Sequence, residues 1–543
     1  MSIRHLPTEI ILHICRFLCL HCQLPRVVDA PPCLYDQAAS GQKALAHISR
    51  SCRRMQDIAQ MTLFHWFHSR RCEDGSPDPV QGLESFLQAI IQHPHLARSV
   101  EALTFLVPDS YYDYMVFGDL GDIHWDGIYR EAVDRVGGGR RRLRSAASEQ
   151  HESSRPALED FQDLAIALAP RLSQLCLKRA LQYLTDQRQL ALTWAGWSHD
   201  LANLKYLALP GAEKYALHGT YHMQEVKNLL LHAPNLEVLD AADCACAGDD
   251  YYRIVRYREN KPWGVPLARL KKLSLNGINV DEVANMLREC PVVEDLELFN
   301  DYENHEVESS VFWRVLRPQT HLRHVRGTLR RLCYSMGTEP IYTRGGDDDD
   351  DGDYIGDENI RVILDVADIL LEREDDAEGL AGATFASFPV LEVLEIEQIV
   401  LYGSIFPIPP SPDEEQDVCL LENTVEDFLG RMPPSIRHLR VGSVVHWPIL
   451  RRDLAALAQG PSSRSRFPHL EIVTVEVFVA PPRQQWQALA DELSTLAIRA
   501  CLNYAKTGPL SRGLLPSRPA EPEITPKPVL YLDHGSREID QYT

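Results

Sequence analysis

A short apolar phrase recurs along most of this chain, and it limits the folds that the chain can adopt. The phrase reads L-x-x-L-x-L, with another residue in place of some leucines. Its copies are Val100, Leu103 and Phe105; Leu172, Leu175 and Leu177; Leu204, Leu207 and Leu209; Leu236, Leu239 and Ala241; Leu270, Leu273 and Leu275; Val293, Leu296 and Leu298; Leu391, Leu394 and Ile396; Ile436, Leu439 and Val441; and Leu470, Val473 and Val475, with a degraded copy at Leu322, Val325 and Gly327. Middle positions from Leu175 to Val325 are 23 to 34 residues apart, which suits a strand, a loop and a returning helix.

Helical segments are visible between the copies of the phrase. The stretches VKNLLLHAP, VANMLRECP and VEDFLGRMP each carry apolar residues at helical spacing. Each of them stops near a proline, which cannot continue a helix. The sequence therefore predicts an α/β chain in which strands and helices alternate.

These features resemble the leucine-rich-repeat family in its irregular, long-repeat form, over roughly residues 83 to 480. The resemblance implies a solenoid with one strand and one helix per repeat. The asparagine that usually follows the strand is present only at Asn276 and Asn300, so the expected solenoid is uneven. We place the array at residues 83–505, with loops near 107–157 and 337–359. A doubly wound α/β domain is the competing interpretation, although no Gly-rich phosphate loop follows any strand.

Two apolar-faced helices are predicted at the N-terminus, between Leu6 and Phe64. Pro7 suits the first turn of a helix, because its φ is fixed and its missing N–H would have had no partner there. The apolar residues that follow on one helical face are Ile10, Ile11, Ile14, Phe17 and Leu18. The stretch ALAHISRSCRRMQDIAQMTLF repeats the pattern. So small a bundle buries a limited core, and a partner or a following domain is expected to stabilise it.

The residues of these two helices resemble the F-box family. The match is carried by Leu6-Pro7-x-Glu9-Ile10, by Leu45-x-x-Ile48-Ser49-Arg50-x-Cys52-Arg53-x-Met55-x-x-Ile58-Ala59, and by Leu63-Phe64. The connection departs from the family, because it is usually a few residues long and here it runs from Cys19 to Gln42. The resemblance implies an F-box-like domain at residues 1–70, with an insert at 19–42, that docks on a Skp-type adaptor and through it joins a cullin-RING ubiquitin ligase. It implies adaptor contacts, or their immediate support, at Leu6, Pro7, Ile10, Ile14, Leu18, Leu45 and Ile48.

A second set of candidate residues alternates with the leucines of the repeats. Since the leucines of each strand point into the core, the residues between them are expected to face solvent along one side of the array. The predicted substrate-binding residues are Lys272, Asn276, Asp295, Glu297, Phe299, His324, Arg326, Glu395, Glu397, His438 and Arg440. Such a row of mixed charge suits a protein or peptide better than a phosphate backbone. A row of ordinary solvated strand residues is the alternative.

Charge and composition narrow the class of partner. The chain has 77 acidic and 55 basic residues and a net charge of -22, so nucleic acid is a poor partner. Its 13 cysteines are scattered, and no secretory signal precedes them, which favours reduced thiols in an intracellular protein of the cytoplasm or nucleus. No apolar run reaches the roughly eighteen residues that a membrane span needs. Four arginines between 140 and 144 form either a nuclear-import cluster or a solvated linker.

Two stretches suggest metal binding, and we predict none at either. Asp347, Asp349, Asp351, Gly352 and Glu358 match a calcium-loop spacing, but an incoming helix is missing and five consecutive aspartates match trivially. Cys19 and Cys22, with His21 and Cys33, provide half of a zinc site, and a second paired half is absent from the sequence. A solvated acidic loop is the expectation at the first stretch, Cys19 is expected in the last turn of the first helix, and no cofactor is predicted.

The sequence also carries no familiar catalytic motif, such as a nucleophile elbow, a Walker loop or H-E-x-x-H. We therefore expect a receptor subunit without catalytic residues, which binds an adaptor at one end and a protein substrate along its repeats. The alternatives are a repeat scaffold with an F-box-like cap and no ligase partner, and a hydrolase whose residues only the fold would assemble. Residues 506–543 read as a proline-rich tail.

Overall fold

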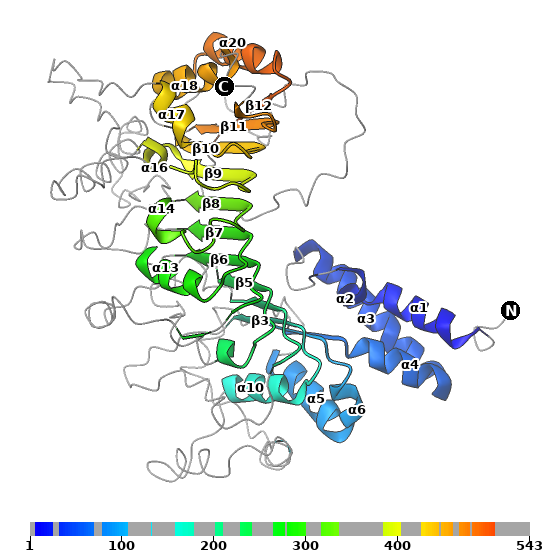
Figure 1. Cartoon of the computed structure of the whole chain (residues 1–543). Coiled ribbons are helices and arrows are strands. Elements are labelled where there is room, and N and C mark those ends of the chain that lie inside the picture. Colours follow the sequence, from blue (N-terminus) through cyan, green and yellow to red (C-terminus); the bar gives the residue numbers. More distant parts are fainter. Residues whose placement is uncertain are drawn as a thin grey trace, which may run out of the picture. The chain divides into compact units, whose positions relative to one another are not determined.

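A computed structural model of the chain describes residues 6–24, 26, 32–69, 79–106, 132, 158–178, 201–209, 229–241, 264–265, 267–276, 280–299, 317–335, 384–402, 425–444, 447–459, 466–477 and 481–504. These belong to two compact units. The first unit comprises Met1–Arg258 with Gly264–Leu275, and the second comprises Glu259–Trp263 with Asn276–Thr543. Each unit is an α/β structure with a parallel sheet whose strands follow one another in chain order (Figure 1). The predicted α/β class is confirmed at this level.

The first unit begins with four helices. They are α1 (Thr8–Leu18), α2 (Leu20–Gln23), α3 (Pro32–Ser51) and α4 (Arg53–Leu63). The prediction of two amphipathic helices is confirmed in α1 and in the pair α3 and α4, which the extended backbone of Cys52 separates. The predicted insert is not a plain loop, because α2 lies within it and α3 already begins at Pro32.

A small core joins these helices. Its buried members are Ile11, Cys15, Cys19, Leu45, Met55, Ile58 and Ala59. Leu6, Leu12, Leu18, Ile48, Cys52 and Leu63 pack around them and are partly buried. Arg54 closes the end of this core, because its guanidinium donates to the Leu6 carbonyl at 2.9 Å and to Thr8 Oγ1 at 3.0 Å.

The sheet of the first unit follows these helices. Its strands are β1 (Trp66–Ser69), β2 (Ala102–Leu106), β3 (Gln174–Lys178), β4 (Tyr206–Ala208), β5 (Val238–Ala241) and β6 (Lys272–Asn276). The second leucines of the repeated phrase, Leu103, Leu175, Leu207, Leu239 and Leu273, stand in register across β2 to β6 and are fully buried. Helices α5 (Pro79–Gln92), α6 (Pro94–Ala97) and α10 (Leu158–Leu168) connect the first strands. Phe86 of α5 stacks on Phe67 of β1.

The second unit repeats this arrangement. Its strands are β7 (Asp295–Phe299), β8 (Arg331–Ser335), β9 (Val393–Glu397), β10 (His438–Val444), β11 (Ile472–Val477) and β12 (Arg499–Tyr504). Its helices are α13 (Val280–Arg288), α14 (Pro318–His321), α16 (Gln398–Tyr402), α17 (Val425–Arg431), α18 (Trp447–Gln459) and α20 (Arg483–Ser494). Leu296, Leu332, Leu394, Leu439 and Val473 form its central buried row.

One predicted strand is wrong. The degraded copy at Leu322, Val325 and Gly327 lies in turns after α14, and the strand is β8, nearer the C-terminus. The true copy is Leu329, Leu332 and Tyr334, whose side chains are all buried. The error has a physical reason: turns bury apolar residues too, and only the alternation from Arg331 to Ser335 buries every second side chain.

Polar side chains that precede the strands link successive repeats. Asn203 donates through Nδ2 to the Pro170 carbonyl at 2.9 Å, and Asn235 donates to the Ala202 carbonyl at 2.7 Å. In the second unit, Thr328 donates to the Val293 carbonyl and Ser435 donates to the Leu391 carbonyl, both at 2.8 Å. These bonds satisfy carbonyl groups in the turns that precede the neighbouring strands.

A buried hydrogen bond between α16 and α18 gives a first prediction. The Tyr402 hydroxyl donates to Asp453 Oδ2 at 2.8 Å. Tyr402 is only 4% exposed and Asp453 only 1% exposed. Tyr402→Phe keeps the ring against Phe428 but removes a donor from a buried carboxylate, which should cost about 1 to 3 kcal/mol of stability. Hydrogen exchange should become faster in α16 and α18. Unchanged exchange there would contradict this role.

Candidate functional site

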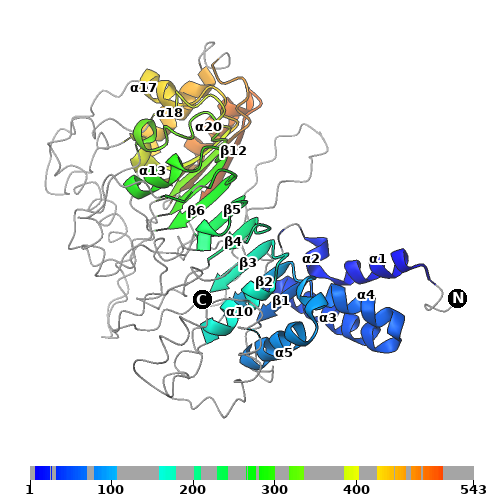
Figure 2. The same cartoon turned by 60° about the horizontal axis from the view of Figure 1, so that its bottom comes forward.

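The insert covers one face of the sheet in the first unit. Leu20 of α2 and Ala38 of α3 are buried against the strands, with Leu24 and Leu34 packed beside them. The strand residues beneath them are Trp66, Ala102, Cys176, Tyr206, Ala208 and Val238. Because side chains alternate along a strand, Phe67 and Phe105 lie on the opposite face, where Phe86 of α5 stacks on Phe67. Figure 2 shows α5 beside β1. The expectation that the alternate residues face solvent is therefore wrong at Cys176, Tyr206, Ala208 and Val238, which are buried in one cluster with apolar side chains of the insert. Asp240 and Lys272 of the same unit stay partly exposed.

Helix α1 carries an apolar surface that the helical core does not use. Ile11 and Cys15 point into that core, whereas Ile10 is 46% exposed and Phe17 is 71% exposed. Ile10 and Phe17 are seven residues apart, which places them on the same side of the helix, with Ile14 between them. Apolar side chains that gather on one exposed side of a helix, beside a core that is already filled, are typical of a binding surface.

The predicted adaptor residues differ in exposure and form three groups. Pro7 and Ile10 are exposed. Leu6, Ile14, Leu18 and Ile48 are partly buried, and Leu45 is completely buried in the helical core. Leu45 supports the helices from within and cannot itself contact a partner. Phe17, the most exposed of these apolar side chains, was seen on the apolar helical face but was not among the predicted contacts.

The corresponding face of the second unit is charged. We call it the charged face and define it by Asp295, Glu297, Arg331, Glu395, Arg440 and Glu476. Arg331 lies at its centre, with Nη1 3.0 Å from Asp295 Oδ1 and Nη2 2.9 Å from Glu395 Oε1, and it also pairs with Glu297. Arg440 bridges Glu395 at 3.1 Å and Glu476 at 2.7 Å. The charges thus form one connected network across β7 to β11.

Electrostatics keep the two arginines of this network charged. Burial by itself would lower the pKa of Arg331, but Glu395, Asp295 and Glu297 together raise it. Burial by itself would also lower the pKa of Arg440, but Glu476 and Glu395 together raise it. Since the side chain of Arg331 is 19% exposed and that of Glu395 is 13% exposed, these pairs are only weakly screened by water.

The predicted substrate-binding residues are only partly brought together. Asp295, Glu297, Glu395 and Arg440 meet in the charged face, and Arg331 was missed because its strand was misplaced. His324 and Arg326 are exposed in turns outside the strands, so the prediction that places them on the strand row is wrong.

The remaining predicted residues lie beside this network or apart from it. Glu397 lies on the same face of β9 as Glu395, but it is only 4% exposed and accepts a hydrogen bond from Ser335 at 3.0 Å. Nε2 of His438 lies 3.7 Å from Glu471 Oε2. Phe299 is the last residue of β7. Lys272 and Asn276 belong to β6, and the structure describes only the backbone of Asn276.

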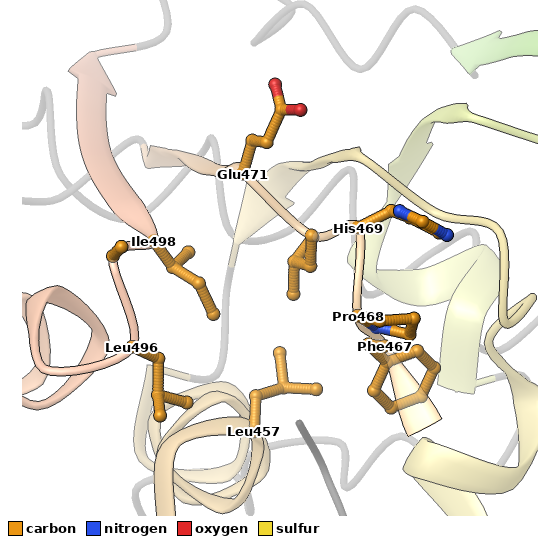
Figure 3. Close-up of a pocket in the computed structure, with 9 residues that line it drawn as sticks. Leu457, Phe467, Pro468, His469, Glu471, Leu496 and Ile498 are labelled. Atoms are coloured by element: carbon orange, nitrogen blue, oxygen red, sulfur yellow. The ribbon is translucent and has the colours of Figure 1, made fainter. Parts of the chain in front are cut away.

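A separate pocket lies near the end of the second unit, and both apolar and polar groups line it. It has a volume of about 270 Å³ and lies between the end of α18 and the turns that precede β11 and β12. Leu457 and Ile498 point into the pocket, while the carboxylate of Glu471 points away from it (Figure 3). This carboxylate forms an ion pair with Arg437, whose Nη2 lies 2.6 Å from Glu471 Oε1.

Four side chains at the junction of helices and sheet could hold a metal ion. Cys19, His21, Cys22 and His65 place one ligand atom each within 4.8 Å of all the others. The first three were noted in the sequence, but His65 is distant in the chain and was missed. No sequence spacing could have revealed it, because the fold of α4 and β1 brings it there. The side chain of Cys33, the other cysteine considered, lies outside the described residues.

The other stretches that the sequence analysis singled out also lie outside the described residues. These are the acidic stretch from Asp347 to Glu358, the arginines between 140 and 144, Asn300, and the tail at 506–543.

Among the helices that the structure describes, none has the length and apolar character to span a membrane. A scan against protein-family models found no match to this chain, and a search of curated proteins found none either.

Proposed function

We propose that this chain is the substrate-recognition subunit of an SCF-type cullin-RING ubiquitin ligase. Its F-box-like helices would dock on a Skp-type adaptor, and its leucine-rich-repeat-like strands would bind a protein substrate. The observation that carries the proposal is the exposed pair Ile10 and Phe17 on α1, beside a helical core that is complete without them. Apolar side chains left in water beside a filled core gain free energy when a partner covers them.

The position of the insert supports docking at α1. An insert lying over α1 would favour the alternative, a repeat scaffold with an F-box-like cap and no ligase partner. Instead, Leu20, Leu24 and Leu34 pack on the sheet of the first unit, and Ile10 and Phe17 keep their exposure. The described residues of the insert therefore leave the apolar side of α1 accessible.

The charged face suggests the chemistry of the substrate. Four carboxylates, those of Asp295, Glu297, Glu395 and Glu476, surround the two guanidinium groups of Arg331 and Arg440. The excess of negative charge favours a substrate segment that carries lysine or arginine. In this role the chain supplies no catalytic group. It raises the concentration of substrate lysines near the charged ubiquitin that other subunits deliver.

Capture of a purified Skp-type adaptor tests the proposal. The wild-type chain should retain the adaptor, and Ile10→Asp with Phe17→Asp should weaken retention at least about tenfold, because two charges would be buried at the apolar contact. Leu231→Asp is the control, since Leu231 is 46% exposed, as Ile10 is, but lies in the repeat region and not on α1. This variant should retain the adaptor as the wild-type chain does. Failure of the wild-type chain to bind, or equal binding by the double variant, would leave the scaffold alternative.

A further inference from the structure

We propose that Cys19, His21, Cys22 and His65 form a zinc site that fastens the F-box-like helices to the first strands of the repeat array. Two thiols and two imidazoles are a donor set that structural zinc sites use. The ligand atoms lie within 4.8 Å of one another, and Cys22 Sγ is 3.2 Å from His65 Nδ1. A tetrahedral zinc ion with bonds of about 2.0 to 2.3 Å needs separations of about 3.3 to 3.8 Å, which small side-chain rotations would provide.

The backbone holds the ligands in place. Cys19 is the extended residue between α1 and α2, and the Cys22 N–H donates to its carbonyl at 3.0 Å. This turn presents the two thiols of a Cys-x-x-Cys pair on the same side. His65 lies in the turn between α4 and β1, and its carbonyl accepts from the N–H groups of Glu101 and Ala102, both at 2.9 Å. The site is thus assembled from rigid segments that are distant in the sequence.

His21 is the most specific indication that a ligand belongs here. Its side chain is 9% exposed, and its Nδ1 is buried and has no hydrogen-bond partner among the residues that the structure describes. Such an atom is costly to bury unless something binds it. Nε2 on the other side of the ring lies 3.6 Å from Glu101 Oε2. A carboxylate that accepts from the second nitrogen of a ligating histidine is the usual outer partner of zinc-bound imidazole.

Burial around the site suggests a structural role for the ion. Cys19 is 6% exposed, whereas Cys22 is exposed and leaves a path for the metal to enter. With four protein ligands, no coordination position would remain for a substrate. The ion would instead join the end of α1 to the start of β1, at the point where the insert begins to cover the sheet.

Metal analysis of the full chain, purified without chelators, tests the site directly. We expect about one zinc ion per wild-type chain and loss of most of it in Cys22→Ser and His65→Ala. His47→Ala and Cys501→Ser are matched controls, since His47 is exposed on α3 and Cys501 lies in β12, and both should keep the metal. Wild-type protein without zinc, or His65→Ala with as much zinc as wild type, would overturn the proposal. So would a Cys19–Cys22 disulfide found by mass spectrometry in the intact, metal-free protein.

A conservative variant separates metal binding from folding. Glu101→Gln leaves all four ligands in place and alters only the group behind His21. Competition with a chromogenic chelator should show zinc bound about 10- to 100-fold more weakly, with the stoichiometry unchanged. Cobalt added to metal-depleted wild-type protein should give the visible bands of a tetrahedral site with thiolate ligands. An octahedral cobalt spectrum, or unchanged zinc affinity in Glu101→Gln, would argue against this geometry.

Discussion

Replacing Gly41 with alanine is expected to lower the free energy of unfolding of the N-terminal helices by about 2 to 3 kcal/mol. Gly41 of α3 passes the last turn of α1, and a Cβ at this position would overlap the carbonyl oxygen of Leu18. Because that oxygen belongs to the backbone, it cannot rotate away as a flexible side chain would. The two helices must therefore separate, and the contacts around Leu45 would loosen. The clash outweighs the roughly 1 kcal/mol that alanine gains over glycine inside a helix.

Gly82 supplies the matched control for this experiment. It also lies within a helix, α5, but a Cβ added there would meet no atom within 4 Å. Gly82→Ala should therefore leave stability unchanged or raise it by up to about 1 kcal/mol. Hydrogen exchange of peptides from α1 and α3 measures the difference locally. The close approach would be refuted if both variants behaved alike in α1 and α3.

Replacing Arg331 with alanine is expected to destabilise the second unit by about 2 to 3 kcal/mol. Its guanidinium contacts carboxylates on β7 and β9, and its removal leaves Asp295, Glu297 and Glu395 close together without their shared cation. Removal of one partner from a buried ion pair costs about 3 to 5 kcal/mol, and the partial exposure of this network reduces the expected value. Hydrogen exchange in β7 to β9 should become faster.

Arg330 provides a control at the adjacent position. Its side chain is 59% exposed and pairs with Glu392 at 3.1 Å. Arg330→Ala should cost no more than about 1 kcal/mol, because water screens the pair. Glu395→Gln should partly restore stability to Arg331→Ala, since it removes one unpaired charge. Equal losses at positions 330 and 331, or no recovery in the double variant, would show that the network does not act as described.

Much of the architecture could be predicted from local pattern. The spacing of Leu175, Leu207 and Leu239 predicts parallel strands at a repeat distance, and these leucines do occupy one buried row. Apolar periodicity likewise places α1 and α4. Such predictions succeed because burial of an apolar face depends on residues within one strand or one helix.

Contacts between distant segments could not be predicted in this way. The assignment of β8 failed because apolar turn residues such as Val325 imitate the phrase, and Arg331 was lost with it. The prediction of solvent exposure at Tyr206 and Val238 failed because another part of the chain covers them. Periodicity reveals which side chains share a face, but not what lies against that face.

The sequence by itself determined that this chain alternates strands and helices and begins with two amphipathic helices, since these properties arise from residues that are neighbours along the chain. The tertiary structure decided which faces remain open. It buried the sheet of the first unit beneath the insert, joined Arg331 and Arg440 through Glu395, and brought His65 to the Cys19–Cys22 turn. These outcomes depend on the packing of segments that are distant in sequence, because hydrophobic burial and charge pairing act between whatever surfaces the fold brings together.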